Sequence, residues 1–267
     1  MSIPKELIAE ICAEENISYD EFSYGYLIRL TKGDKIKHIA VPYWDVNSAA
    51  AARIACDKAA CYTLLTQKNI PAIEHELLFN PLRRSNWIDN YGTWQRALDY
   101  FNANGQKVVA KPNQGFQGLD VYYCDTPATL EHAIQTIFAS APDAALSPYY
   151  EIETEYRCYY IYGRCAYIYG KSKGDSWKHN LSEGATVFEV ENEMLQSTLA
   201  QLACDAAKAI GISFATVDIV TLQSGPFPLA VMEVNAGVNA QLMLEQLPHR
   251  RDTIKSIYVE AVRGMFI

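Results

Sequence analysis

The sequence predicts an α+β fold in which antiparallel hairpins are separated by helices. Two apolar runs near the C-terminus carry this prediction, one over 214–220 and one ending at Glu233-Val234-Asn235. The Ser224-Gly225-Pro226 turn between them favours pairing of the two runs as neighbouring strands. Residues 107–121 show a second strand, loop and strand pattern, whereas 192–210 has the apolar periodicity of a long helix.

The C-terminal hairpin carries two acids and an amide that indicate a metal site. In paired strands Asp218 and Glu233 face each other, and the period of two places Glu233 and Asn235 on the same side. Carboxylate and amide oxygens suit a hard divalent cation such as magnesium, which usually takes phosphate as a further ligand. The alternative is a solvated hairpin whose acids face water, and the apolar surroundings of both runs count against it.

A lysine and two glycines mark the segment 107–121. Lys111 leaves the end of an apolar strand, where it can hold phosphate as a point charge. Gly115 and Gly118 let backbone amides approach anionic oxygens closely. The segment is no Walker loop, because Gly-Lys-Ser/Thr is missing, and a simple turn remains the alternative.

The first 56 residues predict a small N-terminal α+β piece, 1–56. Residues 4–15 have an apolar helical face, and 24–30 and 37–41 read as short strands around a turn at 32–34. An alanine-rich helix then begins after Asn47 or Ser48 as N-cap.

Further along the chain, residues 74–79 predict a strand, and 159–169 a hairpin that turns at Gly163. Apolar periodicity and capping residues also predict a series of helices, which are 57–68, 91–104, 127–139, 192–210 and 250–263.

The order of these motifs resembles the ATP-grasp superfamily, in the branch of the ribosomal protein S6 glutamate ligase, the glutathione synthetases and cyanophycin synthetase. The resemblance covers residues 57 to about 245 and rests on the sequence of matches along the chain more than on any one of them. The matching segments are Asp57-Lys58, Asn69-Ile70-Pro71-Ala72, the Lys111 loop, Ser147 to Glu153, Glu155-Tyr156-Arg157, Lys171 to Lys173, Asn180 to Ala185, Asp218 and Glu233-Val234-Asn235.

The resemblance implies ATP and magnesium or manganese as cofactors, and it implies roles for particular residues. Arg157 and Lys173 would act in catalysis, with Arg157 contacting the substrate or the transferred phosphate. The implied metal ligands are Asp218, Glu233 and Asn235. The implied nucleotide-binding residues are Lys58, Lys111, Gly115, Gly118, Tyr150, Glu151, Glu153, Lys171 and Asn180.

The resemblance further implies an ATP-grasp fold, in which two α+β lobes clasp ATP, over residues 57–267. Residues 107–150 would form the ATP-lid lobe and 151–267 the metal-binding lobe. The implied activity is ATP-dependent ligation of a carboxylate to an amine through an acyl phosphate. An ATP-grasp kinase and a non-catalytic ATP-binding module are the alternatives. Because members of this branch usually carry about a hundred residues before the lysine helix, a usual domain size, the N-terminal α/β domain is reduced here.

Composition limits the partners. With 23 basic and 31 acidic residues, the net charge of −8 disfavours nonspecific nucleic-acid binding. No apolar stretch reaches the roughly 18 residues that a membrane span needs. Seven cysteines, none spaced C-x-x-C, predict reduced core thiols and a cytoplasmic protein. The expected substrate is a small amino acid or peptide, and the family resemblance suggests a homodimer.

Overall fold

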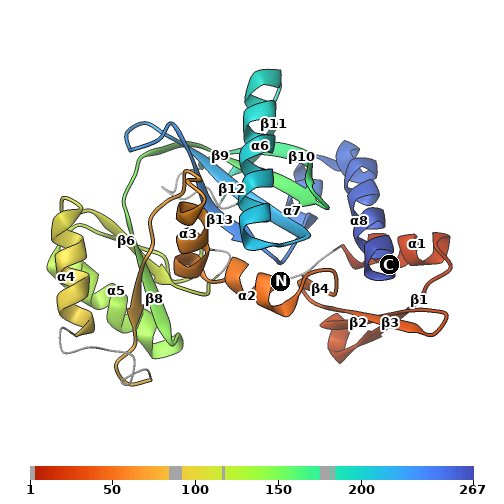
Figure 1. Ribbon diagram of the computed structural model, residues 1–267, viewed down its shortest axis with the longest axis horizontal. Coiled ribbons are helices and arrows are strands. Elements are labelled where there is room, and N and C mark those ends of the chain that lie inside the picture. The colour runs from red at the N-terminus through yellow and green to blue at the C-terminus, as the bar shows by residue number, and fades with distance from the viewer. Residues whose placement is uncertain (1–3, 84–91, 116–117, 175–180, 182–183) are drawn as a thin grey trace.

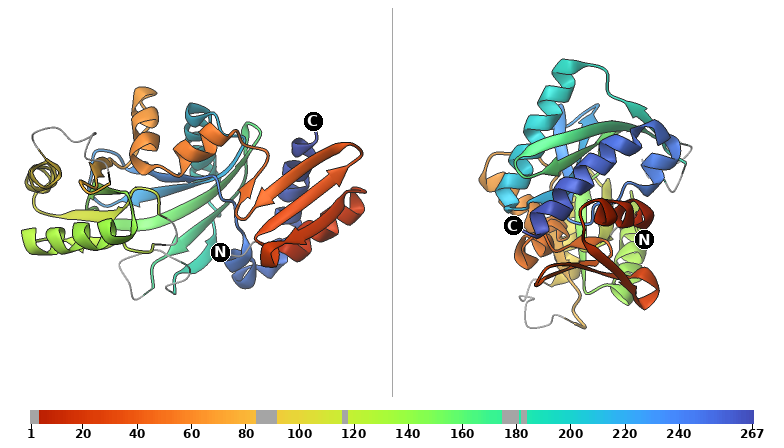
Figure 2. Two further views of the ribbon diagram at one scale, coloured as in Figure 1. Left: turned by 90° about the horizontal axis from the view of Figure 1, so that it is seen from below. Right: turned by 90° about the vertical axis from the view of Figure 1, so that its right-hand side faces the viewer.

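Antiparallel sheets and helices build the chain, which confirms the α+β prediction. The computed structural model describes residues 4–83, 92–115, 118–174, 181 and 184–267. Within this part of the chain the strands form three sheets, which we call the N-terminal, small and central sheets. Two views at right angles show the small sheet at one end, the N-terminal sheet at the other and the central sheet between them (Figures 1 and 2).

The N-terminal sheet has the order β1-β2-β3-β4 and packs with helices from both ends of the chain. The predicted helix is present, but the strand expected from Tyr24 starts later, because Ser23 and Tyr24 adopt positive φ angles in a 3₁₀ turn. The elements are α1 (Lys5–Glu14), β1 (Ser18–Phe22), β2 (Leu27–Lys32), β3 (Lys35–Ala40), β4 (Tyr43–Trp44) and the last helix, α8 (Arg251–Met265).

Two capped helices lead from this sheet into the rest of the chain. Ser48 caps α2 (Ala49–Ala55), accepting from the backbone N–H of Ala51 at 3.1 Å. Asp57 caps α3 (Lys58–Gln67) in the same way, through the N–H of Ala60 at 3.0 Å. Lys58 is therefore the first residue of its helix.

The small sheet has the order β5-β8-β6-β7, and two helices cover its core around Phe101 and Leu130. The second strand, predicted to lie within the 107–121 pattern, instead begins just after it, at Tyr122. Residues 118–120 form a turn in which Asp120 has φ 54°. The elements are β5 (Glu76–Phe79), α4 (Thr93–Ala103), β6 (Val108–Pro112), β7 (Tyr122–Cys124), α5 (Pro127–Ser140) and β8 (Asp143–Pro148).

The central sheet has the order β11-β10-β9-β12-β13. One face packs under α6 (Glu193–Ile210), whose left-handed C-cap is Gly211. Part of the other face, around Tyr159 and Phe214, joins the core of the N-terminal sheet and α8. The strands are β9 (Ile152–Ile161), β10 (Arg164–Ser172), β11 (Thr186–Glu189), β12 (Phe214–Leu222) and β13 (Leu229–Asn235), with the short α7 (Gln241–Gln246) after them.

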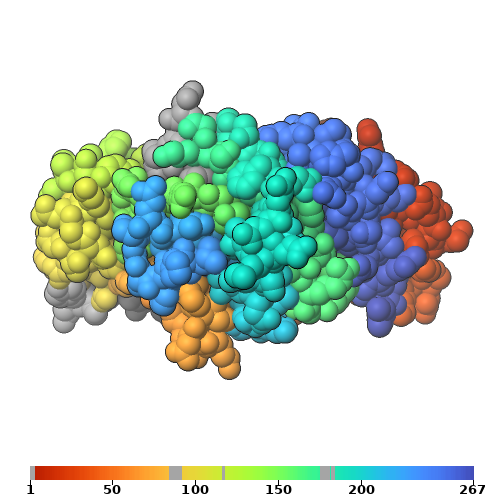
Figure 3. Space-filling view, turned by 90° about the horizontal axis from the view of Figure 1, so that it is seen from above, coloured from red at the N-terminus to blue at the C-terminus, as the bar shows by residue number. Residues whose placement is uncertain are grey.

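The molecule is elongated, with the small sheet and its helices at one end and the N-terminal residues at the other (Figure 3). The helices of the described residues are all too short or too polar to cross a lipid bilayer. The division into segments at residues 57, 107 and 151 stays a prediction.

Candidate active site

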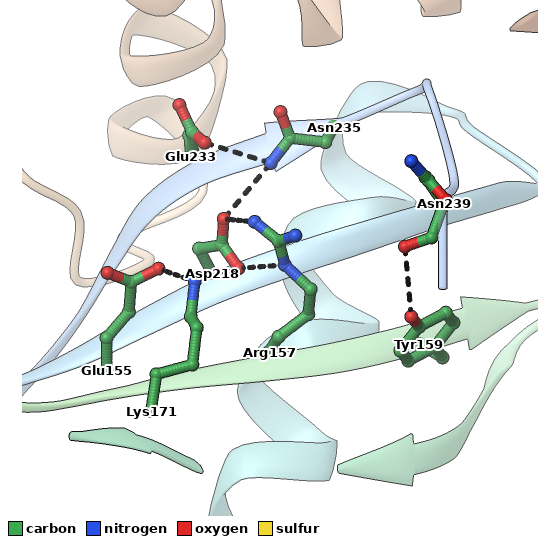
Figure 4. A network of polar contacts seen from close by, with 8 residues as sticks. All are labelled: Glu155, Arg157, Tyr159, Lys171, Asp218, Glu233, Asn235 and Asn239. Carbon is green, nitrogen blue, oxygen red and sulfur yellow. Dashed lines mark hydrogen bonds and ion pairs between the residues drawn. The ribbon is translucent and has the colours of Figure 1, made fainter. Parts of the chain in front are cut away.

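The middle of the central sheet carries a buried ion pair centred on Asp218. Strand register places Asp218 of β12 between Arg157 of β9 and Glu233 of β13. Arg157 donates to both carboxylate oxygens of Asp218, from Nε at 2.7 Å and from Nη2 at 2.5 Å (Figure 4). The Asp218 side chain is 1% exposed, so this bidentate pair is shielded from water.

A second ion pair lies beside the first on the same face of the sheet. Lys171 of β10 contacts Glu155 of β9, and its Nζ is also 3.8 Å from Asp218 Oδ1. Burial raises the pKa of Asp218, but Arg157 and Lys171 outweigh it and hold that pKa at about 2. Burial also raises the pKa of Glu155, to about 7, against the effect of Lys171. Asp218 is thus held ionised, whereas Glu155 gains and loses its proton near pH 7.

Asn235 lies between the two proposed metal-binding acids. Its Nδ2 donates to Asp218 Oδ2 at 3.2 Å and to Glu233 Oε1 at 3.0 Å, so an electropositive amide group occupies the space between the carboxylates. Rotation of the amide by 180° would place Oδ1 there, and the two orientations of an amide are a matter of assignment. Two carboxylates and an amide oxygen are hard ligands that a divalent cation takes, although no group of three or more acids, histidines or cysteines able to hold a metal is found among the described residues. The donor set fits magnesium or manganese.

Two lysines, one on α3 and one on the small sheet, lie on the other side of the site. Neither forms an ion pair with a described carboxylate. The backbone N–H of Lys58 donates to the Asn113 carbonyl at 3.2 Å, and Lys58 Nζ donates to the Gly115 carbonyl at 2.8 Å. Lys111 projects from β6, and burial together with Lys58 lowers its pKa to about 8. The helix cap Asp57 accepts from Gln114 at 3.1 Å and so ties the loop to α3.

His75 lies close enough to both lysines to feel their charge. It is 5% exposed, and burial, followed by Lys111 and Lys58, lowers its pKa well below the ordinary range. The imidazole is therefore neutral. His75, Lys58 and Glu233 line one small, partly open space of about 10 Å³, so Lys58 lies near Glu233 at this point.

The linker residues predicted to cross the adenine pocket lie between the small and central sheets. Tyr150 and Ile152 pack on an apolar cluster that includes Ile73 and Leu222. Glu151 and Glu153 are exposed, and the Glu151 carbonyl accepts from the backbone N–H of Gln223 at 3.1 Å. A backbone carbonyl has two lone pairs, so this hydrogen bond leaves the backbone of Glu151 able to make a further contact.

The remaining predicted residues are less closely grouped. Lys173 is exposed just beyond the end of β10, whereas Gly118 has φ 68° in the turn before β7. Asn180 lies outside the described residues. The structure thus brings together Lys58, Lys111, Gly115, Arg157, Lys171, Asp218, Glu233 and Asn235.

Sequence reasoning missed Glu155 and His75 as site residues. Glu155 stands two residues before Arg157, so strand alternation already placed both on one face. His75 gave no such signal, because its proximity to both lysines depends on how α3 meets the small sheet. Tyr159, whose hydroxyl donates to the Asn239 carbonyl at 3.2 Å, closes the same face toward the N-terminal sheet (Figure 4).

Solved structures share this fold. The D-alanine–D-alanine ligase of Bacillus anthracis matches with a TM-score of 0.64 and 17% identity, over 82% of this chain and 70% of that chain. The same enzyme in complex with ATP matches with a TM-score of 0.61 and 18% identity, again over 82% of this chain and 70% of the other. At this identity the likeness establishes the fold alone.

Sequence relatives carry the name of one enzyme class. A "Probable alpha-L-glutamate ligase 2" of Pseudoalteromonas atlantica is 26% identical over 196 residues, which are 72% of this chain and 59% of that protein. A "Probable alpha-L-glutamate ligase" of Pseudomonas savastanoi pv. phaseolicola is 29% identical over 138 residues, which are 50% of this chain and 43% of that protein. The chain thus spans about half the length of these relatives. The model of the RimK-like ATP-grasp domain matches residues 55–248, and the chain therefore belongs to the RimK-like ATP-grasp family.

Proposed function

We propose that this protein is an ATP-dependent carboxylate–amine ligase that forms an amide or peptide bond through an acyl phosphate. The observation that carries the proposal is the meeting of two opposite sets of groups at one place. Lys58 and Lys111 supply positive charge, with Glu233 close enough to raise the pKa of Lys111, and Glu233 with Asn235 and Asp218 supplies a divalent-cation donor set. Lys58 and Glu233 line one small space of about 10 Å³, which places the two charges near each other.

In this proposal the two lysines hold the nucleotide phosphates. Both lie beside residues 113–115, and Lys58 Nζ donates a hydrogen bond to the Gly115 carbonyl. The loop can therefore follow the phosphates when they bind and exclude water. Water exclusion matters because an acyl phosphate hydrolyses readily. Tyr150, Glu151 and Glu153 would line the base and ribose, and Lys171 would support Asp218.

Asp218, Glu233 and Asn235 would hold the metal. For this, Asn235 would turn its amide oxygen toward the ion, and Asp218 would bind both the ion and Arg157. When bound, magnesium or manganese neutralises phosphate charge and orients the terminal phosphoryl group. The protein side of this arrangement is prepared, because Arg157 and Lys171 hold Asp218 ionised by keeping its pKa at about 2.

Arg157 is the group best placed to act on the substrate side. Asp218 uses its Nε and Nη2, which leaves Nη1 free of that carboxylate (Figure 4). A guanidinium at this position would stabilise the negative charge that develops as the substrate carboxylate takes the phosphoryl group. The amine then attacks the acyl carbon, and phosphate leaves. Lys173, on the exposed segment after β10, would approach the substrate from the solvent side.

The substrates in this proposal are an amino acid or small peptide that supplies the carboxylate, and a second molecule that supplies the amine. The names of the sequence relatives suggest glutamate as one of the two. Dimer formation stays a prediction from the family resemblance.

Release of inorganic phosphate from ATP, measured with a panel of carboxylic acids and amines, tests the proposal. A ligase releases phosphate only when both an acid and an amine are present, and mass spectrometry finds the amide. A stable phosphorylated product without an amine would instead indicate a kinase. Binding of ATP with no turnover across the panel would indicate a non-catalytic module. Glu233→Gln serves as the inactive control, because it keeps the shape of the side chain and removes the charge.

A further inference from the structure

Three of the seven cysteines lie together on the face of the central sheet that points away from the site. Cys158 of β9 follows Arg157 directly, so strand alternation turns it to the opposite face. Cys158, Cys165 of β10 and Cys204 of α6 all pack in the core cluster under α6. All three are free thiols, as the sequence predicts.

A second cleft gives solvent access to one of these thiols. The cleft has a volume of about 460 Å³, and Cys165 is part of its lining. It lies along the edge of β10, because β11 pairs only with residues 169–172 of that strand. The first half of α6 forms one wall, and Arg250 lies at the other side. Cys165 is half-buried, whereas Cys158 is fully buried.

The three thiols differ in their chemical surroundings. A hydrogen bond from the Cys158 thiol holds the pKa of Cys165 below its ordinary value. Burial raises the pKa of Cys158 well above the ordinary range, so Cys158 stays protonated and serves as the donor. Burial raises the pKa of Cys204 as well, although Cys204 is only half-buried and its Sγ lies 3.7 Å from the Gly163 carbonyl, in the turn just before Cys165.

We propose that Cys165 is a peroxide-reactive thiol and that Cys204 resolves its oxidised form as an intramolecular disulfide. The Cys165 thiolate attacks one oxygen of hydrogen peroxide, the O–O bond breaks, and hydroxide leaves to become water with the thiol proton. The Cys204 sulfur then attacks the sulfur of the resulting sulfenic acid, and a second water leaves. Two thiols are oxidised and one peroxide is reduced to two waters.

The assignment of the three roles follows from access and protonation. The attacking thiol must reach the oxidant as a thiolate, which selects Cys165 at the cleft. The resolving thiol must lose its proton to water, which selects the half-buried Cys204 over the fully buried Cys158. The disulfide would join α6 to the β9–β10 hairpin and leave the opposite face of the sheet unchanged.

Peptide mapping by mass spectrometry of the reduced full-length chain, before and after hydrogen peroxide, tests this inference. We expect a Cys165–Cys204 disulfide. We also expect Cys165 to react with iodoacetamide faster than Cys56, a matched control that is likewise half-buried and hydrogen-bonded to the Tyr43 hydroxyl at 3.3 Å. Cys165→Ser should remove the disulfide, and Cys204→Ser should leave a sulfenic acid at Cys165 that dimedone traps.

Several results would overturn the inference. They are faster labelling of Cys56 than of Cys165, a disulfide from Cys165 to Cys158, and no modification of Cys165 under excess peroxide. Circular dichroism of both serine variants establishes that they fold. The readouts need neither ATP nor turnover, so their outcome is independent of the proposed ligase activity.

Discussion

The two sides of the candidate active site differ in how their charges are balanced. On the central sheet, Asp218 and Glu155 are each paired with a cation, Arg157 or Lys171. On the other side, Lys58 and Lys111 form no ion pair with a described carboxylate, and burial and Lys58 hold the pKa of Lys111 at about 8 although Glu233 and Glu155 raise it.

This difference separates the side of the site whose charges are paired within the protein from the side whose charges require a bound anion. On the paired side, contacts within the protein offset the cost of desolvation, because each buried ion has a partner. The lysine side is incomplete until an anion arrives, and a triphosphate is an anion of suitable charge. The comparison therefore predicts that substitutions on the paired side reduce stability, whereas substitutions on the lysine side reduce nucleotide affinity.

The largest expected effect is on the paired side. Asp218→Ala should lower the free energy of unfolding by about 3–5 kcal/mol, because it leaves the Arg157 guanidinium largely buried without its partner. Urea denaturation measures this change. Glu233→Gln is the matched control and should cost far less, since Glu233 is only partly buried and has no ion pair among the described residues. Equal losses in the two variants would contradict the distinction.

A substitution on the lysine side should affect binding and spare the fold. Lys111→Met should weaken ATP binding about 10- to 100-fold, the range expected for loss of a hydrogen bond to a charged group. Its free energy of unfolding should change little, because burial and Lys58 oppose the charge of Lys111 whereas Glu233 and Glu155 favour it. Lys107→Met, at an exposed position just before the same strand, is the control and should bind ATP normally. Calorimetric titration with ATP distinguishes them.

The same lysine predicts a pH dependence of ATP binding. The cationic form of Lys111 binds phosphate, and its pKa in the free protein is about 8. Above pH 8 binding must therefore take up a proton, and the Kd should rise with pH, by at most about tenfold per unit. Below pH 8 this contribution to the Kd is constant. A Lys111→Met variant should lack the rise, and a wild-type Kd that stays constant between pH 7 and 9.5 would contradict the assignment.

The smallest expected effect concerns the loop after the metal-binding strand. A Cβ on Gly237 would lie 2.6 Å from Pro42 Cγ, so the N-terminal sheet packs directly on the loop that follows Asn235. Gly237→Ala should displace this loop and weaken metal-dependent ATP binding a few-fold. Pro42→Ala in the same chain removes the obstructing ring and should restore binding. Failure of this rescue would show that the contact does not position the loop.

Much of the fold could be predicted from local patterns. Ser48 and Asp57 are strong N-caps, and Gly211 marks the end of α6, so these helices were correctly placed. β1 was missed because none of its residues is fully buried, which leaves no apolar alternation to detect. β8 was missed because Ala144 and Ala145 have weak strand propensity, although both are fully buried.

The site could be predicted only as far as single strands allow. Period-2 alternation placed Glu233 and Asn235 together, and the pairing of their strand with that of Asp218 followed from the turn. The bidentate contact of Arg157 with Asp218 depends on the register between β9 and β12. Between the end of β9 and the start of β12 lie 52 residues, and the sequence does not show how the elements within them are placed. The sequence therefore identified the charged groups without revealing which of them neutralise each other.

Calorimetric titration of ATP with and without magnesium, in wild-type protein and in Glu233→Gln, tests the central claim most directly. The account predicts that magnesium strengthens ATP binding to the wild type and that this gain is largely lost in Glu233→Gln, while binding without magnesium is similar in both. An equal gain from magnesium in the two proteins would contradict the proposal that Glu233 holds the metal against the nucleotide.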